Sequence, residues 1–439
     1  MGPDLVEASG PIMLSVDQAL ETLLIHIQPL AEEKIALFNS LGQIAAEDVR
    51  ASINVPEWDS ASRDGYAVKS GSIKGACPGH PCVLKVIDTA AAGSIAQHSV
   101  TAGTAIRIMT GAQIPAGADC VVRFEDTDEE TRGLETSAIG FKEIGILIEA
   151  QALTNIRPAG ESIAKDTLVL AKGRRIGPGE LGLLSSLGLS QVKVIRRPVV
   201  AIIATGDELV NPGKPLSSPG IYNSNSFTIA ALVKSAGCLP KILGIARDNR
   251  ASLIAKMRRA MKADAIITCG GSSVGDFDLV KKIVSQLGRI VFRKVNMSPG
   301  QPFSFGLIKD ARTQKTGRTL PHFILTGNPS AAMVNFEVLV RPALLKMQGR
   351  TDLFPPLIEA TLKGPFENKK QSRCFLWAVL NKQEDAFFAD ISPTPGQAVF
   401  PLIAAANGLV IVPESKNSLQ PQDKVQAIPL DWSFARWHL

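Results

Sequence analysis

Aromatic residues are scarce in this sequence, and long apolar runs are absent from it. Phe, Trp and Tyr make up 5% of the 439 residues, and basic residues are not interleaved with them. Surfaces that stack nucleic-acid bases combine aromatic and basic side chains, so the composition argues against nucleic acid as a partner. No run of about 18 uncharged apolar residues occurs, so we expect no ordinary membrane-spanning helix.

Targeting and disulfide signals are also missing. The first ten residues carry Asp4 and Glu7 and lack the basic region that opens a signal peptide, so we expect a cytoplasmic protein. The six cysteines are scattered along a long chain, which favours reduced thiols over a disulfide framework. Cys77 and Cys82 flank a His but lack a nearby second pair of ligands, so a turn is a better interpretation than a zinc site.

The charge of the chain is mild for its length. Lys and Arg number 47 and Asp and Glu number 41, which gives a formal net charge of +6 without any block of like charges. This balance suits an anionic small substrate at least as well as a nucleic acid. Hydrophobic residues at 45% and charged residues at 20% predict folded cores. At roughly 150 residues per domain, the length predicts about three domains.

The succession of apolar patterns predicts a multidomain α/β protein. Helical spacing, short β-rich runs and a strand–helix alternation follow one another along the chain. We expect an elongated helical or linker subdomain, a small β-rich subdomain, a doubly wound α/β substrate domain and a small C-terminal β domain. These parts cover residues 13–50 with 151–195, 51–150, 196–350 and 351–439, in that order.

Local patterns specify several elements. Ser15 and Gln18 form a capping box before one helix, and a second helix is expected from about Glu32 to Val49. From Arg196 to Met347, apolar strands alternate with amphipathic helices, which predicts a mostly parallel sheet with helices on both faces. The predicted strands are Val199–Ala204, Lys241–Ile245, Ala265–Cys269, Ile290–Val295 and Phe323–Leu325.

Ligands of such sheets bind beyond the carboxyl ends of the strands, so the loops after the strands form the candidate site. Glycines in these loops let the backbone approach a ligand, and helix starts offer free N–H groups to a phosphate. Carboxylates in the same loops would repel a phosphate unless a cation lies between them. We therefore predict a Mg²⁺ ion held by oxygen ligands. The predicted metal ligands are Asp207, Asp276 and Asp278.

Further motifs follow one another from about residue 13 to 430. They are Asp64-Gly-Tyr-Ala67, Arg107-Ile-Met-Thr-Gly-Ala112, Ala204-Thr-Gly-Asp-Glu-Leu209, Gly270-Gly271 with Ser273-Val-Gly-Asp276 and Asp278, Pro302-Phe-Ser-Phe-Gly306, Gly327-Asn-Pro329 and Ala406-Asn-Gly-Leu-Val-Ile-Val-Pro413. In these motifs and their order, the chain resembles the molybdopterin molybdotransferase family, which includes bacterial MoeA and the E domain of gephyrin.

The resemblance implies an activity and a set of site residues. It implies insertion of molybdate into adenylylated molybdopterin, with release of AMP and help from Mg²⁺, at a cleft between the subunits of a homodimer. Other molybdenum-cofactor proteins are further implied partners. The implied catalytic residues are Asp64, Thr110, Glu208, Asp248 and Lys294. The implied substrate-binding residues are Gly206, Gly270, Gly271, Ser273, Gly275, Pro299, Gly327, Asn328 and Pro329.

The chain departs from the family pattern at positions associated with the oxyanion. Lys-Pro-Gly-Lys-Pro is here Ser298-Pro-Gly-Gln301-Pro, so two ammonium groups are replaced. A charge-assisted contact to an oxyanion is worth on the order of 1.5–3 kcal/mol, so these replacements weaken anion binding. Arg63, beside Asp64, would restore part of the charge. The other replaced positions are Ser162 for Asp, Ser330-Ala331 for Val-Ser, Trp377 for Arg and Gln397 for Ser.

Three functions are compatible with this sequence. The retained carboxylate and glycine loops favour a molybdopterin molybdotransferase or a close variant. The replaced lysines favour a pterin-binding protein that no longer inserts metal and acts as a chaperone, regulator or scaffold. A third hypothesis is a related transferase for a modified pterin or another oxyanion. Asp207, Asp276 and Asp278 favour the enzymes, because a scaffold needs no metal site.

Overall fold

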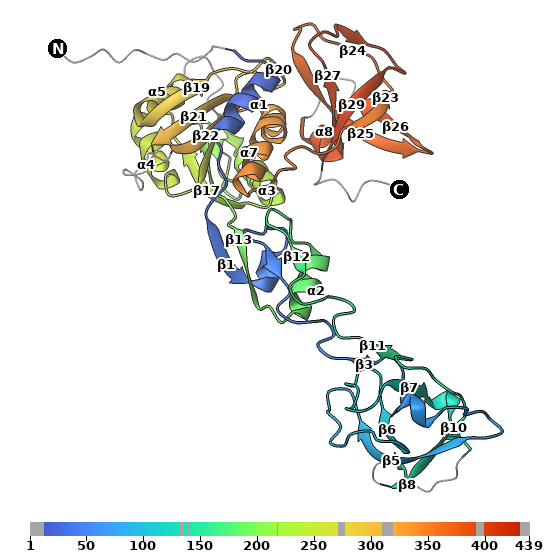
Figure 1. The fold of residues 1–439 in the computed structure, drawn as a ribbon. Helices are drawn as coiled ribbons and strands as arrows, with labels where there is room; N and C mark the ends of the chain where they lie inside the picture. The colour runs from blue at the N-terminus through green and yellow to red at the C-terminus, as the bar shows by residue number, and fades with distance from the viewer. Residues whose placement is uncertain are drawn as a thin grey trace. The chain divides into compact units, whose positions relative to one another are not determined.

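The chain folds into two compact units, which Figure 1 traces from the N-terminus to the C-terminus. The larger unit contains the chain up to Ile35, Gly42–Ala46 and the chain from Lys193 onward, and the smaller unit contains Ala36–Leu41 and Glu47–Val192. No described helix is long and apolar enough to cross a membrane. The structure, a computed structural model, describes residues 13–131, 136–137, 140–216, 218–270, 277–309, 319–391 and 399–430.

A six-stranded sheet forms the centre of the larger unit. Its strand order is β17-β14-β18-β22-β21-β19, and the first four strands run parallel. Strand β21 runs antiparallel to both of its neighbours, so β19 points in the same direction as the parallel strands. The strands are β14 Val199–Thr205, β17 Leu239–Ala246, β18 Ala265–Gly270, β19 Gly288–Phe292, β21 Ser304–Lys309 and β22 Thr319–Leu325.

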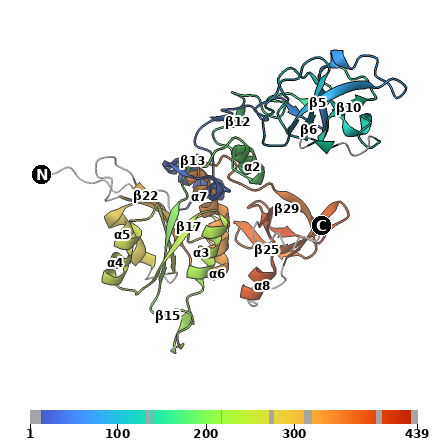
Figure 2. The same cartoon turned by 90° about the horizontal axis from the view of Figure 1, so that it is seen from below.

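Helices cover both faces of this sheet, with α3 and α6 on one side and α4 and α5 on the other (Figure 2). Val200 and Ile202 of β14 join the core beneath α3. Ala201 and Ile203, which alternate with them, join the core beneath α4 and α5. Burial on both faces explains why β14 is a continuous apolar run, and the doubly wound prediction is confirmed. The helices are α3 Asn225–Ser235, α4 Arg250–Ala260, α5 Phe277–Leu287 and α6 Pro329–Asn335.

The first helix, α1 (Val16–Ile25), begins at the predicted capping box. The Ser15 N–H donates to Gln18 Oε1 at 3.0 Å, and the Gln18 N–H donates to Ser15 Oγ at 3.2 Å. This helix packs against α7 (Arg341–Met347), which continues α6 through a π-helical segment at Phe336–Val340. The chain from Pro329 to Met347 is therefore helical throughout.

The second predicted helix, from about Glu32 to Val49, is wrong. The segment forms strand β1 (Glu32–Ala36), a 3₁₀ turn (Leu37–Ser40) and strand β2 (Val49–Arg50). Gly42, between them, has a φ of 80°, which lies outside the right-handed helical region. Strand β1 pairs with β13 (Gln191–Ile195), so pairing with a distant segment overrides the local helical spacing. The sequence patterns also missed β21, which runs antiparallel to the other described strands of a sheet that is mostly parallel, as predicted.

A closed ring of strands forms the C-terminal part of the larger unit. Its five strands pair in the order β25-β26-β23-β29-β27, and β27 pairs again with β25. Strand β20 (Met297–Ser298) extends this sheet by pairing with the start of β25. The barrel strands are β23 Ile358–Leu362, β25 Arg373–Gln383, β26 Ala386–Ile391, β27 Gly408–Val412 and β29 Lys424–Pro429.

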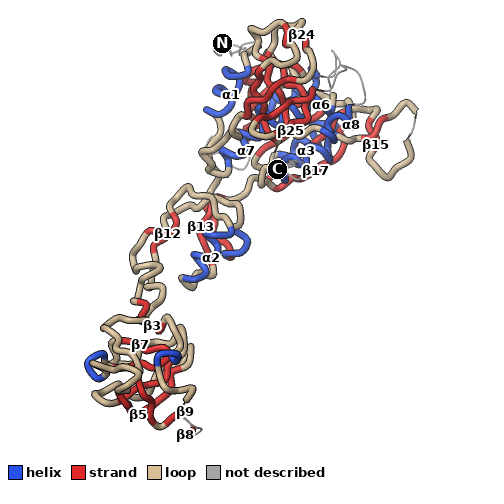
Figure 3. Tube along the Cα trace, turned by 90° about the vertical axis from the view of Figure 1, so that its right-hand side faces the viewer, coloured by secondary structure: helices blue, strands red, loops and turns tan. Residues whose placement is uncertain are grey.

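The smaller unit is built around a five-stranded sheet with the order β10-β5-β6-β4-β7. Figure 3 shows β5 and β7 within the body that these strands form. Helix α2 (Pro178–Ser186) packs beside the 3₁₀ turn at Leu37–Ser40. The sheet strands are β4 Gly65–Val68, β5 Cys82–Ala90, β6 Thr104–Ile108, β7 Cys120–Arg123 and β10 Glu143–Ile146.

Candidate functional site

Two aspartates meet at the carboxyl ends of the neighbouring strands β14 and β17. The Asp207 N–H donates to Asp248 Oδ2 at 3.1 Å, and the Asp248 N–H donates to Asp207 Oδ1 at 3.2 Å. Arg247 Nη1 also donates to the backbone oxygen of Asp207 at 2.7 Å. These bonds hold two carboxylates and a guanidinium at the sheet edge where the sequence predicts ligand binding.

Gly206 makes the turn before Asp207 possible. Its N–H donates to the backbone oxygen of Ala246 at 3.2 Å, and its φ is 149°. A Cβ at this position would lie 2.5 Å from Glu208 Oε2, so any larger residue would displace the Glu208 carboxylate. The glycine therefore allows Glu208 to fold back over the strand end.

A small pocket of about 50 Å³ opens at the ends of β14 and β18. We call it the Thr205 pocket. Within the part of the chain that the structure describes, Thr205 Oγ1 and Asn223 Nδ2 have no hydrogen-bond partner, although both side chains are buried. Asn223 Oδ1 accepts the Ser226 N–H at 3.2 Å, which fixes the amide orientation. A ligand would satisfy these orphaned polar atoms. The lining residues are Ala204, Thr205, Glu208, Leu209, Ile221, Tyr222, Asn223, Ser224, Asn225, Cys269, Gly270 and Gly327.

A second pocket of about 390 Å³ lies around the turn at Pro299, and we call it the Pro299 pocket. Gly300 has a φ of 105°, and a Cβ there would lie 2.2 Å from Asn335 Nδ2. That amide donates to the backbone oxygen of Gly300 at 3.0 Å, so the turn is clamped to the helix below it. The lining residues are Met297, Ser298, Pro299, Gly300, Gln301, Pro302, Thr326, Asn328, Ala331, Lys370 and Ser372.

The loop between β22 and α6 borders both pockets. Gly327 lines the Thr205 pocket and accepts a hydrogen bond from Asn225 Nδ2 at 2.8 Å. Asn328 lines the Pro299 pocket and caps α6 by accepting the Ala331 N–H at 3.1 Å. Pro329 is the first residue of α6. A ligand that fills both pockets would therefore cross this loop.

In the smaller unit, Asp64 and Thr110 lie side by side on the surface. The Thr110 N–H and hydroxyl donate to Asp64 Oδ1 at 2.7 and 2.9 Å. The backbone bond and then the hydroxyl bond hold the pKa of Asp64 below its usual range. Strands β4 and β6 pair antiparallel, with Gly65 opposite Ile108. This pairing brings Asp64, just before β4, next to Thr110, just after β6.

Other predicted site residues are not brought into this geometry. Lys294 follows β19 and is exposed, but it lines neither pocket. Asp278 belongs to α5, and its side chain lies outside the described residues. Among described residues, no three or more His, Cys, Asp or Glu side chains form a group that could hold a metal. The predicted residues Gly271, Ser273, Gly275 and Asp276 and the replaced Gln397 lie outside the described residues.

Two of the family replacements contact each other. The Trp377 indole N–H donates to Ser330 Oγ at 2.7 Å, while Ala331 beside it is buried. Arg373, near the position of the family's arginine, instead pairs with Asp17 at 2.6 Å and with Glu414 at 3.2 Å. Ser162 is exposed in the smaller unit, where its N–H donates to Val55 at 3.0 Å.

Several lining residues carry no signal in the sequence, and Asn223 and Lys370 are two of them. Asn223 belongs to an ordinary polar loop. Lys370 follows another lysine, and such pairs usually lie on a solvated surface.

Residues 14–188 match the MoeA N-terminal region (domain I and II), and residues 201–346 match a probable molybdopterin binding domain. The chain is 34% identical to the molybdopterin molybdenumtransferase of Bacillus subtilis over 427 residues, which is 97% of this chain and 95% of the relative. The chain belongs to the molybdopterin molybdenumtransferase family.

Other relatives agree with this membership. The molybdopterin molybdenumtransferase of Staphylococcus epidermidis is 34% identical over 425 residues, with 96% of each chain covered. The crystal structure of the MoeA protein from Pyrococcus horikoshii has 31% identity and a TM-score of 0.80, with 95% of this chain and 99% of that chain covered. Family membership supports a transferase role in molybdenum cofactor biosynthesis and confirms the resemblance seen in the motifs.

Proposed function

We propose that this family member inserts molybdate into adenylylated molybdopterin and releases AMP. The observation that carries the proposal is the β22–α6 loop, which borders both the Thr205 pocket and the Pro299 pocket. An extended substrate with a pterin, a phosphoanhydride and a nucleotide needs more than one adjoining pocket. Water cleaves the phosphoanhydride, which releases AMP and leaves the terminal phosphate on the pterin. The two dithiolene thiols bind molybdenum, and one molybdate oxygen leaves as water with their protons.

The proposed roles follow the chemistry of each group. Asp207, Glu208 and Asp248 lie at the carboxyl edge of the sheet, where glycines allow a phosphate to approach. Asp64, with its lowered pKa, is an ionised carboxylate throughout the neutral range and is held by Thr110. Lys294 is proposed as a further cation for the substrate.

Mg²⁺ belongs to this proposal. Carboxylate oxygens are the ligands that Mg²⁺ prefers, and Asp207 supplies such oxygens at the sheet edge. Asp276 and Asp278 would complete the protein ligands. The ion would neutralise charge on the phosphoanhydride. We expect Asp276→Ala and Asp278→Ala to abolish stimulation by Mg²⁺ while the circular dichroism spectrum is unchanged. Full metal stimulation in either variant would contradict the metal assignment.

A homodimer is also part of the proposal, because the family resemblance implies a cleft between subunits. Sedimentation velocity of the purified chain should report twice the monomer mass of 46.7 kDa. A monomer at micromolar concentration would contradict the homodimer but not the proposed activity.

The second candidate is a pterin-binding protein that does not insert metal. It is favoured by Ser298 and Gln301, which line the Pro299 pocket where the family pattern has two lysines. The two candidates differ in turnover but not in pterin binding. A protein of this kind would bind molybdopterin without releasing AMP.

The deciding experiment is complementation of a molybdotransferase-deficient strain, followed by a purified assay. The chain is mixed with adenylylated molybdopterin, molybdate and Mg²⁺, and AMP release and pterin-bound molybdenum are measured. Asp248→Ala should lose both, whereas Asp390→Ala, which removes an exposed barrel carboxylate, should retain them. Binding without AMP release in the unmodified chain would favour the second candidate.

A further inference from the structure

The Pro299 pocket has an unusual charge composition for a site at the edge of an α/β sheet. Among the described residues that line it, Lys370 is the only charged one, and none is a carboxylate. Ser298, Gln301 and Asn328 contribute neutral polar groups from two further loops. A cavity with one cation, several neutral hydrogen-bond donors and no anion favours a negatively charged ligand.

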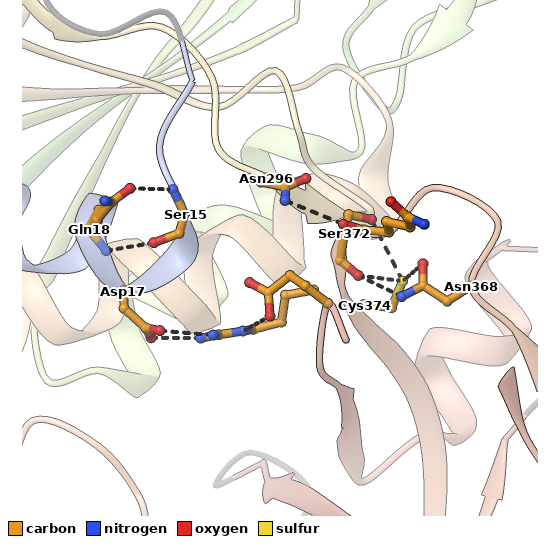
Figure 4. A network of polar contacts seen from close by, with 10 residues as sticks. Ser15, Asp17, Gln18, Asn296, Asn368, Ser372 and Cys374 are labelled. Atoms are coloured by element: carbon orange, nitrogen blue, oxygen red, sulfur yellow. Dashed lines mark hydrogen bonds and ion pairs between the residues drawn. The ribbon is translucent and has the colours of Figure 1, made fainter. Parts of the chain in front are cut away.

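The turn that carries Lys370 is anchored on both sides. Asn368 and Ser372 are 3% and 2% exposed, and Asn368 Nδ2 donates to the backbone oxygen of Ser372 at 2.9 Å. The Asn368 N–H donates to the backbone oxygen of Asn417 at 2.7 Å. Between the anchors, Gln371 has a φ of 49°, which closes the turn. Figure 4 shows Asn368, Ser372 and Cys374 joined in one polar network beside Asn296.

The cations next to Lys370 in the chain have other partners. Arg373 binds Asp17 and Glu414, as described above. Lys369 pairs with Glu367 at 3.4 Å, and both side chains are largely exposed. Within the described part of the chain, Lys370 forms no ion pair. Its ammonium group is therefore available to a ligand in the pocket.

We propose that Lys370 binds an oxyanion in the Pro299 pocket, with the Ser298 hydroxyl and the Gln301 amide as neutral donors beside it. The inference rests on the proposed function, since molybdate and the substrate's phosphates are both oxyanions. Lys370 comes from the turn before β25, whereas the replaced lysines would have come from the Pro299 turn itself. The proposed cation, Lys370, therefore lies on a different wall of the pocket from the lysines of the family pattern.

The test compares neighbouring lysines in the full chain. Molybdate and tungstate binding are measured by calorimetry for the unmodified chain, Lys370→Gln, Lys370→Arg and Lys369→Gln. We expect roughly tenfold weaker binding for Lys370→Gln, because one charge-assisted contact is lost. Lys370→Arg should retain most of the affinity, and Lys369→Gln should match the unmodified chain. Added salt should weaken binding to the unmodified chain more than binding to Lys370→Gln.

Several outcomes would overturn the inference. Equal affinity in Lys370→Gln and the unmodified chain would do so, and so would an equal loss in Lys369→Gln. Absence of molybdate, tungstate, phosphate and AMP binding to the unmodified chain would also overturn it. Parallel titrations with inorganic phosphate and AMP identify the source of the oxyanion. A Lys370-dependent affinity for phosphate or AMP alone supports the site and assigns it to the substrate's phosphate.

The inference and the proposed function can fail separately. If the chain releases no AMP but molybdate binding depends on Lys370, the function is wrong and the inference stands. If the chain inserts molybdenum with the same KM for molybdate and the same phosphate affinity in Lys370→Gln, the inference is wrong and the function stands. A rise in KM with unchanged kcat is the expected result for a binding residue.

Discussion

Trp377 of β25 donates its indole N–H to the hydroxyl of Ser330 at 2.7 Å. Ser330 lies in the first turn of α6, so the contact joins the C-terminal barrel to the helix that follows the central sheet. In the sequence, the two residues are separate departures from the family pattern. In the structure they form a single contact.

A double-mutant cycle should measure this coupling. Ser330→Ala removes the acceptor, and Trp377→Phe removes the donor while retaining much of the aromatic packing. We expect each single variant to lower the free energy of unfolding by about 1–3 kcal/mol, because the buried indole N–H or the half-buried Ser330 hydroxyl loses a partner. The double variant should be less destabilised than the sum by about 1 kcal/mol. Additive losses in urea titrations would show that the two residues are not coupled.

The ionisation of Asp64 should depend on Thr110. The folded-state pKa is lowered, first by the Thr110 backbone N–H and then by its hydroxyl. A lowered carboxyl pKa stabilises the fold above the unfolded-state pKa, and this contribution is lost as the pH falls through the folded-state pKa. Thr110→Val keeps the backbone donor and removes the hydroxyl, so the Asp64 pKa should rise only part of the way. NMR titration of the side-chain carboxyl measures the shift, with Thr101→Val as the control for an exposed threonine elsewhere. An unchanged pKa in Thr110→Val would exclude the hydroxyl contribution.

Burial of His322 should make the larger unit sensitive to acid. His322 is fully buried in β22, contacts Thr268 Oγ1 at 3.1 Å, and has a pKa lowered by burial to about 3. The unfolded chain binds this proton near pH 6.5 but the folded chain does not, so stability is lost as the pH falls from about 6.5 toward 3. We expect a loss of about 2 kcal/mol at pH 5 relative to neutral pH.

The variant His322→Gln isolates this effect, because it keeps a polar group near Thr268 but does not titrate. Its stability at neutral pH should be lower than that of the unmodified chain, since the side chains differ in shape. Between pH 7.5 and pH 5, however, urea titrations should show about 2 kcal/mol less change for the variant. An identical pH dependence in the two proteins would mean that His322 titrates normally.

The sequence predicted the elements whose cause is local and missed those whose cause is distant. The capping box at Ser15 and the apolar run of β14 depend on neighbouring residues or on continuous burial, and both were predicted correctly. The segment from Glu32 became a strand because it pairs with β13, which lies far along the chain. Strand β21 is a different case, because its antiparallel partners β19 and β22 are near it in sequence.

The candidate site shows the same division. Glycines and aspartates after strands indicate a site because parallel strands end at one edge of a sheet, and Asp207 meets Asp248 there. Lys370 could not be found in this way. It reaches the Pro299 pocket from the turn before β25, and only the folding of the barrel beside the sheet brings it to that wall.

Restoring the lysines of the Pro299 turn is the most direct test of whether this site is weakened or altered. Ser298→Lys and Gln301→Lys place two more ammonium groups in a pocket that already contains Lys370. Gly300 and its hydrogen bond with Asn335 are unchanged, so both lysine side chains should occupy the positions of the serine and glutamine that they replace. If the chain is a weakened molybdotransferase, the double variant should need roughly tenfold less molybdate for the same rate.

The gain should be less than additive, because neighbouring lysines repel each other and Lys370 shares the pocket. Combining the double variant with Lys370→Gln should then cost less than Lys370→Gln costs in the unmodified chain. Ser415→Lys, which adds one charge to an exposed barrel loop, controls for general attraction of anions and should leave the KM for molybdate unchanged. If the double variant shows an unchanged molybdate dependence, the weakened-enzyme hypothesis is wrong. The Pro299 pocket would then indicate a pterin-binding protein without metal insertion, or a transferase for another oxyanion, because added positive charge would not increase the use of molybdate.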